Sequence, residues 1–159
     1  MAMVGVSFGL NPQPEPPAQI PDQALDMIKH HEGVKTKPYQ CPAKLWTIGV
    51  GHLIKADEQW MLNATLTDQQ VEDLFRSDLR WCDEALTDAV RVPLNQNQMD
   101  ALYSLCFNIG ADHFKSSEVV QHLNRNDYNG AANAFMNWVT PAVLEPRRKK
   151  EKALFLTDI

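Results

Sequence analysis

Residues 22–52 read DQALDMIKHHEGVKTKPYQCPAKLWTIGVGH, and two kinds of local structure follow one another in this segment. Its first part predicts a short helix, because Asp22 can cap the start and Ile28 and Glu32 share one face at helical spacing. Gly33 is suited to end the helix, since glycine readily adopts the left-handed conformation found just after a helix. The segment therefore begins with a short amphipathic helix that ends at a carboxylate.

The second part of this segment, residues 37–52, predicts a small antiparallel hairpin. Aromatic and β-branched residues such as Trp46, Thr47 and Ile48 favour strands, and prolines and glycines interrupt them at intervals that suit turns. A carboxylate at a helix end is thus followed directly by a hairpin.

Helical patterns fill the rest of the chain. Thr67 and Gln70 form a capping-box pattern that opens a helix reaching to about Ala89, which is long enough to link two lobes. Further helical patterns, each bounded by Gly, Pro, Asn or Asp, lie at 95–109, 116–123, 129–138 and 146–155. The sequence predicts an α+β fold, with a small antiparallel β-sheet lobe and a larger helical lobe joined by a long helix.

The domain organisation expected from these patterns is one domain preceded by an arm. Residues 1–21 carry five of the ten prolines and show no periodicity, which predicts a flexible arm. Residues 22–159 form the domain, with a small lobe at 22–66, a linking helix at 67–90 and a helical lobe at 91–159. A chain of 159 residues can bury roughly two thirds of its unfolded surface.

Composition excludes several classes of protein. The net charge of -5 argues against a nucleic-acid binder, because such proteins gain affinity by neutralising phosphates. No segment is apolar enough to span a bilayer, and the first residues do not fit a secretory signal, so we expect no stable membrane insertion. The basic run at 147–150, with Lys152, predicts a solvated helix face, with local attraction to an anionic cell wall as the alternative.

The three cysteines are widely spaced and lack CxxC spacing. This pattern indicates neither a disulfide framework nor a zinc site, and we expect reduced thiols, no metal and no cofactor. Cys82 and Cys106 fall on apolar helical faces, which predicts that both pack in the core.

Glu32 is unusual for a helix-terminal residue. It lies on the apolar face and in the last turn, where the helix dipole disfavours negative charge, and both effects favour a protonated carboxyl. Such a group can donate a proton to a leaving oxygen, as the acid does in glycoside hydrolysis. Taken alone, a terminal glutamate that faces water is the commoner explanation, so the assignment depends on the residues that follow.

Those residues have a specific spacing. Cys41 follows Glu32 after eight residues, and Thr47 follows after five more, within Trp46-Thr-Ile-Gly-Val-Gly-His52. This arrangement resembles the phage lysozymes, or endolysins, of glycoside hydrolase family 24, which have Glu, eight residues, Asp or in some members Cys, five residues, Thr and Ile-Gly-x-Gly-His. The resemblance extends over about residues 23–155, through Phe107-Asn-Ile-Gly110 and Arg147-Arg148 to Glu151.

The resemblance implies roles for three residues. Glu32 is the general acid, and Cys41 and Thr47 hold a water against the opposite face of the sugar, with inversion of configuration. An ordinary cysteine is only slightly ionised at pH 7, so we expect Cys41 mainly to position the water or, if its pKa is lowered, to accept its proton. A buried structural cysteine and a covalent thioglycoside are the alternatives. His52 is expected to be structural.

The resemblance also places Arg147 near the catalytic glutamate, with a surface cation as the alternative. Side chains that could bind the N-acetyl groups, hydroxyls or rings of the sugar are Asn108, Ser117, Asn137, Trp46 and Trp138, although each could equally serve the structure alone.

The activity that the resemblance implies is hydrolysis of the β-1,4 bond between N-acetylmuramic acid and N-acetylglucosamine in peptidoglycan, leading to lysis of the bacterial host. We expect a monomer, made in the host cytoplasm, that reaches the periplasmic wall through a separate membrane lesion. Two alternatives stay open: a non-catalytic peptidoglycan-binding virion protein and a lytic transglycosylase, which would yield anhydro products without a bound water.

Overall fold

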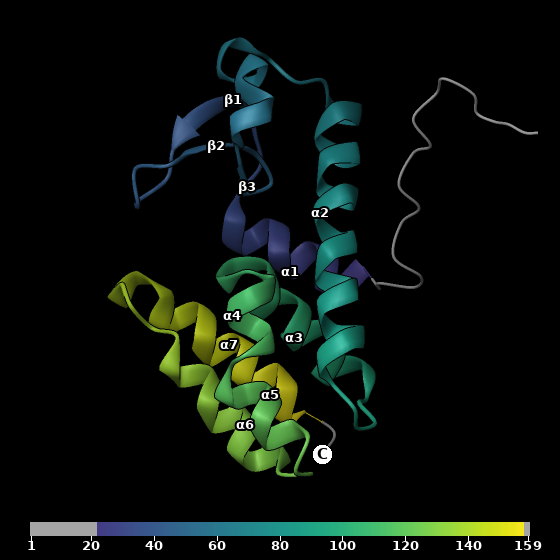
Figure 1. The fold of residues 1–159 in the computed structure, drawn as a ribbon. Coiled ribbons are helices and arrows are strands. Elements are labelled where there is room, and N and C mark those ends of the chain that lie inside the picture. Colours follow the sequence, from purple (N-terminus) through teal and green to yellow (C-terminus); the bar gives the residue numbers. More distant parts are fainter. Residues whose placement is uncertain (1–21, 158–159) are drawn as a thin grey trace, which may run out of the picture.

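The computed structural model describes residues 22–157 (Figure 1), so the predicted arm at 1–21 lies outside the described residues. The helices and strands, in chain order, are α1 (Asp22–Glu32), β1 (Lys35–Gln40), β2 (Trp46–Gly49), β3 (His52–Leu53), the 3-10 helix η2 (Ala56–Asn63), α2 (Asp68–Ala89), α3 (Gln96–Ile109), α4 (Ala111–Lys115), α5 (Glu118–Leu123), α6 (Tyr128–Ala134), the 3-10 helices η3 (Phe135–Asn137) and η4 (Ala142–Leu144), and α7 (Glu145–Leu156).

Helix α2 links the two parts of the molecule. Figure 1 shows the sheet beside one end of α2 and helices α3 to α7 gathered toward the other. The start of α2 is fixed by the predicted capping box, because the Thr67 hydroxyl accepts from the Gln70 backbone N–H at 3.1 Å and the Gln70 side chain accepts from Thr67 N–H at 2.8 Å. The predicted α+β fold class, with a small antiparallel sheet and a larger helical lobe joined by a long helix, is confirmed. The lobe boundaries within 22–159 stay a prediction.

The sheet has three antiparallel strands in the order β1-β2-β3. Tyr39 faces Thr47 across the first pair of strands, and Ile48 faces His52 across the second. The predicted hairpin is therefore present, and the sequence pattern missed only the two-residue β3 that extends it. Ile48 is fully buried and anchors the sheet on the core.

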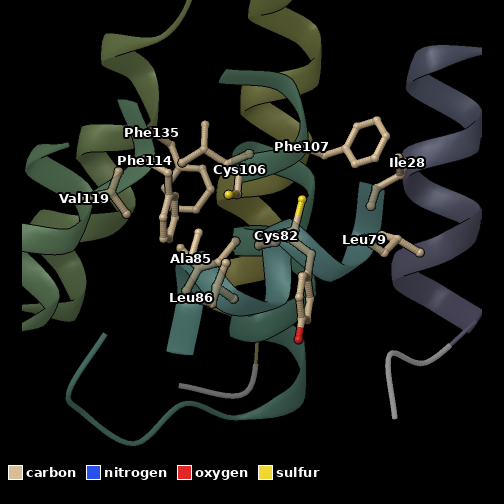
Figure 2. Close-up of a cluster of buried hydrophobic side chains, with 14 of the residues drawn as sticks. Ile28, Leu79, Cys82, Ala85, Leu86, Cys106, Phe107, Phe114, Val119 and Phe135 are labelled. Carbon is tan, nitrogen blue, oxygen red and sulfur yellow. The ribbon is translucent and has the colours of Figure 1, made fainter. Parts of the chain in front are cut away.

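The main core lies between α2, α3 and the helices that follow (Figure 2). Cys82 on α2 and Cys106 on α3 are both 0% exposed, among side chains that include Phe114 and Phe135. Burial and the neighbouring Cys106 raise the pKa of the Cys82 thiol well above its usual value. The prediction that these two cysteines pack in the core is confirmed.

The basic run on α7 departs from its predicted role. Arg147 is 6% exposed and Arg148 is 0% exposed, whereas Lys149 and Lys150 are exposed. The prediction of a wholly solvated face was wrong because α7 packs closely against α3, which supplies partners for the two guanidinium groups. The short helices η2 and α4 were also missed, since neither is long enough to show a periodic pattern.

Candidate active site

Glu32 is positioned by the abrupt end of α1. The next residue, Gly33, has φ +78°, and its N–H donates to the Lys29 carbonyl at 2.8 Å, which closes the last turn. Strand β1 begins only two residues later, at Lys35. The chain therefore turns directly after the carboxylate, and the Glu32 side chain is left 16% exposed at the wall of a cleft.

This cleft has a volume of about 830 Å³ and is lined by residues from both lobes. Glu32 comes from the end of α1, Cys41 and Thr47 from the hairpin, Asn108 from α3 and Arg147 from α7. The fold thus brings the helix-end carboxylate and the two hairpin residues to one cavity, as the spacing implied. A helix end and a hairpin facing a common cleft leave room for a sugar between them.

Cys41 and Thr47 share one backbone carbonyl. The Cys41 N–H donates to the Leu45 carbonyl at 3.0 Å, and the Thr47 hydroxyl donates to the same oxygen at 2.9 Å. Burial raises the pKa of the Cys41 thiol, but hydrogen bonds from the backbone at Leu45 and Ala43 and from Thr47 outweigh burial, so the net pKa is lowered. Cys41 is therefore easier to ionise than an ordinary cysteine.

Arg147 joins Glu32 to the helical lobe. Its Nη1 donates to Glu32 Oε2 at 2.5 Å, its Nε donates to Glu151 Oε2 at 3.0 Å, and its Nη2 donates to the Ser104 carbonyl at 3.0 Å. Three different groups therefore fix one nearly buried guanidinium. Because of this contact, one carboxylate oxygen of Glu32 is held by an ion pair.

Glu151 forms ion pairs with two arginines, Arg147 and Arg148. It is fully buried, and besides Arg147 it accepts from Arg148 Nη1 at 2.7 Å and from the Ser104 hydroxyl at 2.5 Å. Arg148 in turn donates to the Trp138 carbonyl at 2.9 Å and to Asn108 Oδ1. Burial lowers the pKa of Arg148 despite the opposing charge of Glu151. This network supports the helical wall of the cleft.

Sequence reasoning gave Glu151 no role beyond its place in the resemblance. The available signal was its spacing, because Glu151 lies four residues after Arg147 and three after Arg148, and both separations bring side chains together on a helix. Such spacing is equally typical of solvated helices, which is why burial had to come from the tertiary structure.

Gly51 was also missed, although it lies within the Ile-Gly-x-Gly-His motif. It has φ +62°, and a Cβ added there would lie 2.5 Å from Glu32 Oε1. Real Cβ atoms do not approach an oxygen that closely, so the Glu32 carboxyl can occupy its place only beside a glycine. The position could have been found by asking why the motif has a second glycine.

His52 has both ring nitrogens in ion-pair contacts. Nδ1 lies 2.8 Å from Asp78 Oδ2 and Nε2 lies 2.8 Å from Glu58 Oε1. Burial lowers the pKa of His52, but the two carboxylates outweigh burial and the net pKa is raised. The ring therefore ties β3 to α2 and η2, and neither nitrogen is free for a substrate.

The remaining sugar-binding candidates lie in different surroundings. Asn108 lines the cleft. Ser117 is buried and caps α5, since its hydroxyl oxygen accepts from the Val120 N–H at 3.3 Å, while its O–H donates to the Phe114 carbonyl at 2.7 Å. Among the described residues that line the cleft, Ser117, Asn137, Trp46 and Trp138 do not appear. The ring of Trp138 instead lies 5.6 Å from that of His113.

Metal-binding clusters and membrane spans are both absent from the described residues 22–157. These residues contain no group of three or more His, Cys, Asp or Glu side chains arranged to hold a metal ion. None of their helices is both long enough and apolar enough to cross a membrane.

Comparison with known proteins places these features in a family. The phage lysozyme family model matches residues 29–151. The endolysin of Salmonella phage P22 is 42% identical over 144 residues, which cover 87% of this chain and 99% of that protein. The endolysin of Acyrthosiphon pisum secondary endosymbiont phage 1 is 39% identical over 145 residues, which cover 86% and 97% of the two chains.

A solved structure leads to the same assignment. The muramidase domain of SpmX from Asticaccaulis excentricus superposes with a TM-score of 0.74 at 37% identity, covering 87% of this chain and 98% of that domain. Since the family model spans more than half of the sequence and both relatives are matched over nearly their full length, the chain belongs to the phage lysozyme family and is a lysozyme.

Proposed function

We propose that this lysozyme is an endolysin that hydrolyses the β-1,4 bond between N-acetylmuramic acid and N-acetylglucosamine in peptidoglycan. Glu32 is the general acid, and a water held by Cys41 and Thr47 attacks the anomeric carbon from the opposite face, so that configuration inverts. The observation that carries this proposal is the common cleft, which Glu32 lines from α1 and the other two residues line from the hairpin.

The two oxygens of Glu32 have different surroundings, and this supports its role as the acid. Oε2 is held by Arg147, which leaves Oε1 to carry the proton that goes to the leaving oxygen. Glu32 gains a negative charge as it gives up that proton. Arg147 lies where it stabilises the new charge, so the contact strengthens as the bond breaks.

The hairpin pair supports delivery of the water. The Thr47 hydroxyl donates to the Leu45 carbonyl and keeps lone pairs free to accept from a water. The lowered pKa of Cys41 suits the thiolate form, which can accept the proton that the water loses. No metal is needed for these steps, because acid, base and oriented water are all provided by side chains.

The cellular route is part of the same proposal. The protein acts as a monomer on peptidoglycan, is made in the host cytoplasm, and reaches the periplasmic wall after a separate lesion opens the inner membrane. It does not depend on nucleic acid or on insertion into a bilayer.

The deciding experiment compares wild type with Glu32→Gln on cells whose outer membrane has been permeabilised. We expect wild type to clear the suspension and the amide variant, which cannot donate a proton, to lose at least roughly 10³-fold in rate, within the range of general acid catalysis. Mass and NMR analysis of the products separates the reactions, because hydrolysis gives reducing ends of inverted configuration and a transglycosylase gives anhydro ends. Equal clearing by both proteins would contradict the proposal.

A further inference from the structure

Some of the charged side chains that line the cleft are paired with an opposite charge, and others are not. Glu32 is paired with Arg147, and Asp78 is paired with the raised-pKa ring of His52. The other full charges among the described lining residues are two ammonium groups, of Lys55 and Lys150. The cleft therefore carries an excess of positive charge in a chain whose net charge is -5.

Lys150 stands out from its neighbours on α7. Lys149 is paired with Glu145 at 3.0 Å, whereas Lys150 has no carboxylate within ion-pair distance among residues 22–157. Lys150 and Arg147 both lie near His31, since burial and these two positive charges lower the pKa of His31 to about 4 and keep its ring neutral at neutral pH. Its ammonium is thus exposed, unpaired and part of the cleft wall beside the candidate acid.

Lys55 lines the same cleft from the other lobe, directly after β3. The Lys55 backbone N–H donates to Glu58 Oε1 at 3.0 Å, and the Lys55 charge helps to lower the pKa of Glu58, which is also bonded to His52. Among the described residues, no carboxylate lies within ion-pair distance of the Lys55 ammonium. One available cation therefore stands on each wall.

We propose that Lys55 and Lys150 bind carboxylates borne on the lactyl branch of muramic acid, so that the cleft selects strands by their branches as well as by their sugars. This inference rests on the proposed muramidase function. The sugar rings and N-acetyl groups of the strand are uncharged, and an ammonium gains little from them. The anionic groups of the strand are those of the branch: the carboxylates of the peptide stem or, where no stem is attached, the carboxylate of the lactyl group.

The test measures binding rather than turnover, in the Glu32→Gln background so that the strands stay intact. Soluble strands are prepared with their peptide stems, without stems after amidase digestion, and with all carboxylates converted to amides. Calorimetry is then run for the parent, Lys55→Gln, Lys150→Gln and the double variant. Lys149→Gln and Lys35→Gln are the controls, since each removes the same charge from an exposed site outside the cleft lining.

We expect the parent to bind stem-bearing strands about tenfold more tightly than amidated ones, with each lysine contributing about threefold, as for partly exposed ion pairs. The double variant loses that preference, and the two controls keep it. Amidase digestion frees the lactyl carboxylate, which is an amide in the stem-bearing strands. If the stem-free strands bind like the stem-bearing ones, a carboxylate at either position of the branch serves as the ligand; if they bind like the amidated ones, only the peptide carboxylates do.

An unchanged preference in the double variant, or the same loss in the controls, would overturn the inference. Hydrolysis by the protein with native Glu32 is measured in parallel. If this protein does not hydrolyse the strands, the proposed function is contradicted. The binding measurements still test the role of the two lysines, so failure of the proposed function can be told apart from failure of the inference.

Discussion

The guanidinium of Arg147 contacts the carboxylate of Glu32 at 2.5 Å across a separation of 115 residues. This contact joins the end of α1 to α7, and it fixes the orientation of the candidate acid from the helical lobe. Arg147 is itself held by Glu151 and by the Ser104 carbonyl, so the position of Glu32 depends on residues that lie behind the cleft wall.

Replacing Arg147 with methionine keeps much of its length and removes its charge. We expect kcat to fall about 10- to 100-fold, because a charge-assisted hydrogen bond to Glu32 is lost as its carboxylate forms. Rates on soluble peptidoglycan strands measure the effect. Lys152→Met, on the same helix but outside the cleft lining, is the control. An unchanged kcat in Arg147→Met would remove Arg147 from the mechanism.

Glu151→Gln leaves two buried guanidiniums without their shared carboxylate. We expect the free energy of unfolding to fall by about 3–5 kcal/mol, the usual effect of breaking a buried ion pair by removing one partner. Urea unfolding measures it. Glu145→Gln on the same helix breaks only the exposed pair with Lys149 and should change stability by less than about 1 kcal/mol. Similar losses in the two variants would contradict the buried network.

Gly51→Ala puts a Cβ where the Glu32 carboxyl lies. The added atom would be 2.5 Å from Glu32 Oε1, so we expect the carboxyl to move and kcat to fall by at least about tenfold. Gly33→Ala is the matched control, because Gly33 also has positive φ, at +78°, but a Cβ added there would have nothing within 4 Å. It should lose about 1–2 kcal/mol of stability to backbone strain yet keep its turnover once folded. Equal kcat in both variants would mean that the close approach is unimportant.

The His52 contacts predict a dependence of stability on pH. The pKa of His52 is raised in the folded protein, so its contribution is complete below the unfolded pKa of about 6.5 and is lost as the pH rises through the folded value. The pKa of Glu58 is lowered by its bond to His52 in spite of burial, so its contribution is lost as the pH falls through its folded value. The pair therefore stabilises the fold most on the acidic side of neutrality.

Urea unfolding at about pH 5.5 and about pH 8.5 tests this expectation. Burial lowers the pKa of His31 to about 4, so His31 destabilises the fold at the lower pH, and the His52 contribution is read from the difference between wild type and a variant. Asp78→Asn removes one carboxylate from the ring and should lose more stability at the lower pH than at the higher one. An equal loss at the two pH values would assign the pH dependence to other groups.

The role of Cys41 can be tested by replacing its thiol with a more acidic group or with none. Cys41→Asp should retain activity, because a carboxylate can hold and deprotonate the water, and Cys41→Ala should lose most of it. Iodoacetamide offers a separate measurement, since a thiol with a lowered pKa is alkylated faster at neutral pH and Cys82 and Cys106 are fully buried. Thr47→Val removes the hydroxyl whose one proton can turn from the Leu45 carbonyl to the Cys41 thiolate, so it should raise the Cys41 pKa and slow alkylation. An alanine variant with full activity would refute the role of Cys41.

Much of the fold followed from local patterns in the sequence. The capping box at Thr67, the helix that ends at Gly33 and the hairpin around Thr47 each depend on residues a few positions apart, and such interactions form wherever the segment lies. Glu32, Cys41 and Thr47 became candidates together because their spacing resembles the signature of the phage lysozymes.

The tertiary structure alone decided which charges are buried. The basic run at 147–150 predicted a solvated helix face, although the resemblance placed Arg147 near Glu32. Packing of α7 against α3 reversed that outcome, since Ser104, Asn108 and Glu32 supply the partners without which a buried charge is prohibitively costly. Local sequence determines where a helix begins and ends, but the free energy of burying an ion depends on groups that only distant segments can bring to it.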